Sequence, residues 1–368
     1  MTVHADVLIV GGGGAGCSAA LHLALRGARC VLLERGLVGG QASGVNYGGV
    51  RQQGRHPAEL PIARRARELW GRLPALIGTD CEFEVTGHLK LARNPAEEAE
   101  LIAYRDVATA HDLPLRMIGR NAIHEAYPWL GSAVVAGSFA PDDGAANPRL
   151  LAPALARAAR AAGADIREST AATALAHDGA RFTVETAGES FHAPVLLNVA
   201  GFWGGEIAAA FGEPVPVSPL SPNMLVTEPM PYVIEPNLGV VGGNVYLRQI
   251  RRGNVIFGGG RGESDPGRPA ARPLPDVSLA SMNLALELVP HLAGAQVIRS
   301  WTGIDGEMPD HIPVIGPSRT TPGLLHAFGF SGHGFQLAPA IGAILSELVL
   351  DGRTDVPLEP FRIDRFAA

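Results

Sequence analysis

The chain has 368 residues and a net charge of −6, with 46% hydrophobic and 18% charged residues; this composition is typical of a globular enzyme of one to three domains. The charge excludes a broad basic surface for nucleic acid. Three cysteines, Cys17, Cys30 and Cys81, form no CxxC pair and are too few for a disulfide framework. An early first strand and the lack of an apolar run of about 18–20 residues predict a soluble, cytoplasmic protein without a signal peptide or a membrane span.

The first 34 residues have the pattern of a strand–turn–helix–strand unit. Apolar strands are expected at 6–10 and 29–34, with a glycine turn at 11–16 between the first strand and a helix at about 17–26. The crossover has the normal length for two parallel strands. The chain therefore begins with a βαβ unit.

The glycine turn of this unit has the spacing GxGxxG. Gly11 allows a tight turn, Gly13 lets the backbone approach a pyrophosphate, and Gly16 lets helix and strand pack closely. The start of the helix offers free N–H groups to phosphate. Glu34, at the end of the second strand, is placed to bind a ribose, and its carboxylate argues against a 2′-phosphate. The unit predicts one dinucleotide site.

Farther along the chain, helices alternate with short strands. Helices are expected over 61–76, 95–112, 148–162, 276–289 and 335–350. Residues 81–92 alternate in polarity like a half-buried strand, and short strands with turn signals follow before a closing strand at 324–330. The pattern predicts an α/β fold, with a Rossmann-type nucleotide domain and an inserted mixed, β-rich domain. We expect the nucleotide domain over 1–80, 145–215 and 310–368, and the inserted substrate-binding domain over 81–144 and 216–309.

From residue 34 onward the sequence resembles the D-amino-acid oxidase superfamily, and within it the glycine oxidase, sarcosine oxidase and hydroxyproline or opine dehydrogenase branch. Four patches carry the resemblance: Glu34-Arg35, 40–51 (GQASGVNYGGVR), 196–203 (LLNVAGFW), and the motifs WTGIDGEMPDHIPVIG and GFSGHGFQLAPAIG within 301–342. It implies a Rossmann-type FAD domain and hydride transfer from a C–N bond to flavin N5. The stretch TGIDGEMPD has no cysteine, so we expect non-covalent FAD.

The fingerprint and the resemblance together predict the cofactor contacts. They are Gly11, Gly13, Gly14, Ala15, Gly16, Glu34, Arg35, Gln41, Ala42, Ser43, Asn46, Gly48, Gly49, Ala172, Ala200, Gly201, Gly303, Gly332, His333, Gly334, Phe335 and Gln336. The turn 331–335 enters a helix, so its amides and dipole can favour an anionic reduced flavin. The alternative is that this turn only closes a sheet. No cluster has the spacing of a metal site.

Four residues are candidates for the substrate side. The resemblance implies that Arg51 and Tyr246 bind the carboxylate of the substrate, since an arginine fork pairs with it in two places. Arg248 alternates onto the strand face of Tyr246 and is a second arginine candidate. His333 can orient or protonate groups near the flavin. The alternatives are a surface ion pair for Arg51, a core position for Tyr246, and solvation for Arg248.

Two departures from the family pattern bear on the chemistry. Asp305 stands where glycine oxidases have a carboxylate-binding arginine, and it is either a solvated loop residue, the favoured reading, or a ligand for a cationic group. Ile256 and Gln336 stand at the positions of the two sarcosine oxidase lysines. Lys90, the only lysine in the chain, is expected to lie away from the site, so that no lysine is available for either task. This favours a dehydrogenase with a quinone or protein acceptor over an oxidase that uses oxygen.

The expected substrate is a small amino acid or secondary amine, of the sarcosine, hydroxyproline, D-amino acid or opine type. Two alternatives stay open. The chain could be the flavin subunit of a hetero-oligomeric amine dehydrogenase, and a homo-oligomer is equally compatible with the sequence. It could also be an NAD(P)H-dependent flavin hydroxylase, although the DG and GD motifs of that class are present only as ordinary turns.

Overall fold

The computed structural model describes residues 2–367, and its first layer is a six-stranded sheet. In spatial order the strands are β23 (Val314–Pro317), β24 (Leu324–Phe328), β13 (Val195–Asn198), β2 (Val7–Val10), β3 (Cys30–Leu33) and β9 (Asp165–Arg167). All neighbours are parallel except the β23–β24 pair. Strands β2 and β3 are buried along their whole length, as expected for a parallel sheet covered on both faces.

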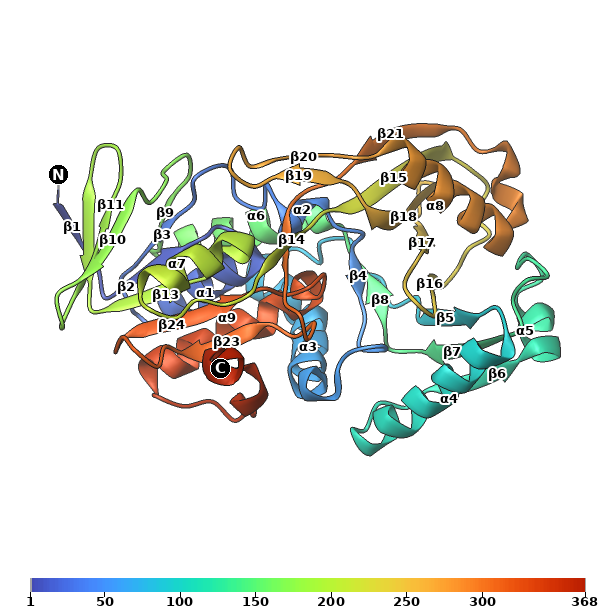
Figure 1. Ribbon diagram of the computed structural model, residues 1–368, viewed down its shortest axis with the longest axis horizontal. Coiled ribbons are helices and arrows are strands. Elements are labelled where there is room, and N and C mark those ends of the chain that lie inside the picture. Colours follow the sequence, from blue (N-terminus) through green and yellow to red (C-terminus); the bar gives the residue numbers. More distant parts are fainter. Residues whose placement is uncertain (1, 368) are drawn as a thin grey trace.

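Helices cover one face of this sheet. They are α1 (Gly14–Leu25), α6 (Pro148–Ala161) and α9 (Gly334–Leu350), and α3 (Leu60–Ile77) packs against α6 and α9. Helices α1 and α9 lie side by side (Figure 1). Their backbones approach closely, because Ser18 donates a hydrogen bond of 3.1 Å to the carbonyl of Pro339, and a methyl group on Gly342 would collide with Ser18.

A smaller, four-stranded sheet and a short helix lie on the opposite face. The strands are β1 (Thr2–His4), β12 (Ser190–Ala193), β11 (Phe182–Glu185) and β10 (Ala174–His177), and the helix is α7 (Gly204–Ala210). Phe182 and Phe191 pack with Leu8 and Leu196 into one apolar cluster. The six-stranded sheet is therefore buried between two layers.

The second large sheet has eight strands. In order they are β21 (Val297–Trp301), β15 (Pro222–Pro229), β18 (Asn254–Arg261), β17 (Tyr246–Gln249), β16 (Asn237–Val240), β5 (His88–Ala92), β7 (Ala136–Ala140) and β6 (Arg116–Gly119). Only β16 and β5 pair in parallel. Three helices accompany the sheet: α8 (Pro275–Leu288), α4 (Pro95–Ala110) and α5 (Arg120–Ala126). Leu89, Leu238 and Phe257 belong to its own apolar core.

Short elements join the two large sheets. They are α2 (Ala42–Val45) and the pairs β4 (Gly49–Val50) with β8 (Gly144–Ala145), β14 (Ser218–Leu220) with β22 (Asp305–Glu307), and β19 (Glu263–Asp265) with β20 (Ala270–Arg272). In Figure 1 they lie between the Rossmann-type layers and the eight-stranded sheet. This junction brings residues that are far apart in sequence to one place.

The expected α/β class with a Rossmann-type unit and a mixed, β-rich insertion is confirmed. One expected strand is shorter than its pattern: of 81–92, only 88–92 forms ladder pairs as β5, because Cys81 and Glu82 have φ values of 57° and 55°, outside the extended region. The domain boundaries remain predictions. Among residues 2–367, no helix is both long and apolar enough to cross a bilayer.

Candidate active site

One cavity of about 910 Å³ lies at the junction of the two large sheets. Most of the residues predicted from the sequence line it. These are Gly11, Gly13, Gly14, Ala15, Glu34, Arg35, Gln41, Ala42, Ser43, Asn46, Gly48, Gly49, Arg51, Ala172, Ala200, Gly201, Tyr246, Gly303, Gly332, His333, Gly334 and Phe335. The cavity therefore runs from the glycine turn after β2 to the side chains of the eight-stranded sheet.

The glycine turn forms one end of the cavity. Gly11 has a φ of +120°, and a methyl group on it would lie 2.4 Å from the carbonyl oxygen of Val199. A methyl group on Gly16 would lie 2.0 Å from the carbonyl oxygen of Gly11. Gly16 is thus not part of the cavity wall, but its missing side chain lets α1 start directly behind the turn.

Glu34 lies over this turn. Its carboxylate accepts hydrogen bonds from the amides of Gly12, at 2.7 Å, and Gly36, at 2.8 Å. The next residue, Arg35, places its guanidinium 3.5 Å from the centre of the Trp203 ring, and both side chains line the cavity. This end offers backbone amides, a carboxylate and a flat cationic surface, which fits the phosphates, ribose and adenine of a dinucleotide.

The start of α9 forms the opposite wall. In the turn before it, Ser331 and Gly332 have φ values of 53° and 83°. Asp305 holds this turn, since its carboxylate accepts from the amides of Gly306, at 2.8 Å, and Gly332, at 2.9 Å. Burial raises the pKa of Asp305 to about 6, against the effect of these two bonds. The favoured reading of Asp305 as a solvated loop residue is wrong.

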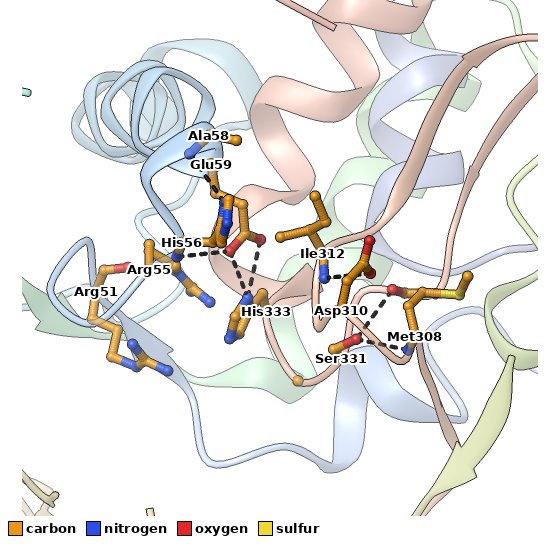
Figure 2. A network of polar contacts seen from close by, with 12 residues as sticks. Arg51, Arg55, His56, Ala58, Glu59, Met308, Asp310, Ile312, Ser331 and His333 are labelled. Atoms are coloured by element: carbon orange, nitrogen blue, oxygen red, sulfur yellow. Dashed lines mark hydrogen bonds and ion pairs between the residues drawn. The ribbon is translucent and has the colours of Figure 1, made fainter. Parts of the chain in front are cut away.

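His333 is the last residue of the turn and pairs with Glu59. Its Nδ1 lies 2.9 Å from a carboxylate oxygen of Glu59, which is fully buried. Figure 2 shows this contact, and it shows Arg51 and Arg55 on the loop that precedes Glu59 in the sequence. Burial and the positive charge of Arg55 lower the pKa of His333 to about 4. Neutral His333 therefore donates from Nδ1 and keeps Nε2 as an acceptor.

Arg51 lies on a loop that buried groups hold in place. Asp143 accepts hydrogen bonds from the amides of Gln52, at 2.8 Å, and Gln53, at 3.0 Å. The Arg51 guanidinium lines the cavity, and its one hydrogen bond within residues 2–367 goes to the carbonyl of Gln53. Most of its donors therefore remain free for a ligand, and with residues 2–367 it forms no ion pair, which argues against the alternative of a surface ion pair.

Tyr246, on β17, faces the same cavity. Its ring packs edge-on against Tyr47 at 5.1 Å, and its hydroxyl lies 3.3 Å from the sulfur of Met224. A thioether is a weak acceptor, so the hydroxyl can turn to a stronger one. Burial raises the pKa of Tyr246, which keeps the phenol protonated and able to donate.

Besides Gly16, two predicted residues, Arg248 and Gln336, are not in the cavity wall. Arg248 is 8% exposed and donates to the carbonyls of Tyr47 and Ala146, both at 2.9 Å, so the alternative of a solvated arginine is wrong. Gln336 is buried against α3, where its amide donates to the carbonyl of Ala63 at 2.8 Å. Both side chains hold backbone together around the site.

The sequence reasoning missed several residues of the wall, above all Lys90, Arg55 and His88. Lys90 was placed elsewhere, and that is wrong: it lines the cavity. The preference for a dehydrogenase, which rested on a site without lysine, loses this support. The alternation HLKLA puts His88 and Lys90 on one face of β5, and this signal could have found them.

The residues present fit a flavin dinucleotide. Side chains on Gly12 and Gly13 would meet Glu34 and Ser43 within 3.0 Å, so the turn leaves room only for a backbone cradle. Two helix starts, at Gly14 and Gly334, line one continuous cavity. Among residues 2–367, no group of three or more His, Cys, Asp or Glu side chains could hold a metal.

Comparisons with known proteins agree with this geometry. The family model described as FAD dependent oxidoreductase matches residues 6–348. Glycine oxidase from Geobacillus kaustophilus is 28% identical over 374 residues, covering 99% of this chain and 98% of that protein. Hydrogen cyanide synthase subunit HcnC from Pseudomonas protegens is 28% identical over 414 residues, with coverage of 100% and 97%.

Among solved structures, L-proline dehydrogenase from P. horikoshii superposes with a TM-score of 0.92 at 27% identity, covering 100% of this chain and 98% of that one. Some further relatives are longer, and the chain spans 44 to 45% of their length. The predicted superfamily and the predicted cofactor, FAD, are confirmed. The chain belongs to the FAD-dependent oxidoreductases of the D-amino-acid oxidase type, which oxidise C–N bonds of amino acids and amines.

Proposed function

We propose that the chain oxidises a small amino acid or secondary amine whose carboxylate is bound by Arg51 and Tyr246. The observation that carries this proposal is the single cavity, with the nucleotide-type glycine turn at one end and these two donors at the other. Bound FAD would supply the acceptor for a hydride from the carbon next to nitrogen. The predicted cofactor contacts would hold it through Glu34, the glycine turn and the start of α9, without a covalent bond.

Each residue at the substrate end has a proposed task. The Arg51 guanidinium binds the carboxylate, and Tyr246 donates a hydrogen bond to it, which fixes the orientation of the reacting carbon. His333, neutral and held by Glu59, presents Nε2 as an acceptor, so it can orient an amine N–H. Arg248 has no contact task in this proposal, because its donors are bonded to backbone carbonyls.

The test is anaerobic reduction of the bound flavin by candidate substrates. Sarcosine, glycine, both prolines, hydroxyproline isomers, D-amino acids and opines are each mixed with the protein, and loss of the oxidised flavin absorbance is followed. At least one should reduce the flavin without pyridine nucleotide, and Arg51→Ala should weaken its binding. Reduction by NADPH alone would instead identify a hydroxylase.

The same protein preparation tests the electron acceptor and the need for a partner subunit. Repeating the assay in air separates an oxidase, which consumes oxygen, from a dehydrogenase, which reduces a quinone-like dye instead. The relative named as a subunit of hydrogen cyanide synthase supports the alternative of a hetero-oligomeric enzyme. A lone chain that reduces its flavin with an amine and passes the electrons on would exclude that requirement.

A further inference from the structure

The wall of the cavity formed by the eight-stranded sheet carries more positive charge than one substrate carboxylate needs. Lys90 is the only lysine among 30 basic residues, and it points into this cavity together with Arg51 and Arg55. Within residues 2–367, none of the three forms an ion pair with a carboxylate. Glu59 and Asp143 act on Arg55 electrostatically, but Arg51 and Lys90 are half-buried without a carboxylate in contact. Such cations are costly, so a ligand that supplies an anion is expected.

Arg51 and Lys90 face the same point of the cavity. A methyl group on Gly54 would lie 3.2 Å from Nη1 of Arg51 and 3.6 Å from Nζ of Lys90. Burial and the charge of Arg51 lower the pKa of Lys90, and the acid that acts against this is the exposed Glu100. Two positive charges held this close repel each other, and an anion bound between them or beside them offsets this repulsion.

The nearby buried acids are already engaged. Glu59 accepts from His333, and Asp143 accepts from the amides of Gln52 and Gln53. Arg55 donates from Nε to the carbonyl of Arg51, and its Nη1 has no partner within residues 2–367. The protein therefore supplies no carboxylate directly to the Lys90 end of the cavity.

The register of the sheet gives this end a defined distance from Tyr246. Tyr246 pairs with Gly239, and Gly239 pairs with Lys90, so all three face the same side. Two strand spacings separate Tyr246 from Lys90, which is on the order of 10 Å. Gly239 has no side chain of its own, and the His88 ring lies over it, since a methyl group there would lie 3.1 Å from its Nε2.

We propose that the substrate is a dicarboxylic amine: an amino acid whose α-carboxylate lies between Tyr246 and Arg51 and whose second carboxylate binds Lys90. Acidic amino acids, iminodiacetate and N-carboxyalkyl amino acids have this form. The inference rests on the proposed function, because it assigns the substrate class of the same site. Lys90 then acts as a specificity-determining residue, and the His88 ring over Gly239 lines the path of the second carboxylate arm.

Binding is tested first without any redox step. Glutarate and its monoamide, which differ by one charge, are titrated into the FAD-loaded protein by calorimetry. Glutarate should bind at least about tenfold more tightly than the monoamide, because only glutarate offers Lys90 a second carboxylate for a charged hydrogen bond. Lys90→Met should remove the difference and Lys90→Arg should keep it. Arg252→Gln, which removes an exposed cation outside the cavity wall, is the matched control and should change nothing.

Turnover is tested next with matched substrate pairs. Both enantiomers of glutamate and glutamine, and iminodiacetate with its monoamide, are compared in anaerobic flavin reduction. In the wild type the diacid of each pair should reduce the flavin more efficiently than the monoamide. In Lys90→Met the two members of a pair should be equally efficient. Equal efficiency within each pair in the wild type would overturn the inference while leaving the proposed function intact. Lys90-dependent glutarate binding without flavin reduction by any amine would instead overturn the proposed function, and only the binding of a second carboxylate by Lys90 would remain.

Discussion

The imidazole of His333 donates a hydrogen bond of 2.9 Å to the carboxylate of Glu59, across 274 positions of sequence. Glu59 lies in the 3₁₀ turn (Pro57–Glu59) that leads into α3, and the amide of His56 also contacts its carboxylate, at 3.3 Å. Burial opposes ionisation of Glu59, but the contact with His333, the charge of Arg55 and the amide of His56 hold its pKa below the usual value. The carboxylate therefore fixes which nitrogen of His333 carries the proton.

This pair makes stability depend on pH in a defined window. The pKa of His333 falls from 6.5 to about 4 on folding. Between these values the unfolded chain binds the proton and the folded chain does not, so stability is complete above pH 6.5 and is lost as the pH falls toward 4. His333→Gln should remove this component, which amounts to about 3 kcal/mol at most.

The measurement is the free energy of unfolding in urea for the wild type and His333→Gln at pH 7, 6, 5 and 4. Asp143 and Asp305 have pKa values raised to about 6, so their contribution to the free energy of unfolding increases as the pH falls, opposite to that of His333. For this reason the wild type and the variant are compared at each pH. A constant gap between the two proteins across this range would show that His333 is not held neutral.

Asp305 places negative charge beside the turn 331–334, which is predicted to face the flavin. A carboxylate there disfavours the anionic reduced cofactor, so Asp305→Asn should raise the reduction potential. We expect roughly 30 mV or more, the two-electron equivalent of a tenfold change in equilibrium. Because the pKa of Asp305 is about 6, the difference should be present at pH 8 and shrink below pH 6. A spectroelectrochemical titration at both pH values decides this.

The sequence predicts the nucleotide end of the cavity well because its geometry is local. The strand, the glycine turn and Glu34 lie within one βαβ unit, and β2, α1 and β3 are close to their expected positions. The same holds for the turn before α9, where His333 immediately precedes the helix. In both places a helix start determines where the backbone amides point.

The substrate end could not be predicted as fully, because it depends on how one sheet is placed against another. Arg248 shares a strand face with Tyr246, as alternation predicts, but the segment at Tyr47 and Gly48 covers it: a methyl group on Gly48 would lie 2.7 Å from Nη2 of Arg248. Lys90 shares a face with His88, yet only the pairing with Gly239 brings that face to the cavity. Long-range register decided both cases.

Gly16 offers a test of the close packing behind the glycine turn. Its ideal Cβ would lie 2.0 Å from the carbonyl oxygen of Gly11, and a backbone atom cannot rotate away as a side chain can. Gly16→Ala should cost at least about 1–3 kcal/mol of folding free energy and lower the FAD content of the purified protein. Gly294→Ala is the control, since nothing lies within 4 Å of that position. Normal FAD content in Gly16→Ala would contradict the close approach of α1.

Loss of Arg51 should lower substrate affinity, whereas loss of Arg248 should lower the stability of the fold. Arg51 has most of its donors free toward the cavity, so Arg51→Ala should weaken substrate binding by about ten- to a hundredfold while stability stays nearly constant. Arg248→Met leaves the buried carbonyls of Tyr47 and Ala146 without their donors, which should cost about 2–5 kcal/mol of stability. Urea unfolding and anaerobic flavin reduction, measured on both variants, separate the two roles. If Arg248→Met kept wild-type stability and lost substrate affinity, the roles assigned here would have to be exchanged, because a buried guanidinium that contributes nothing to folding must serve a ligand.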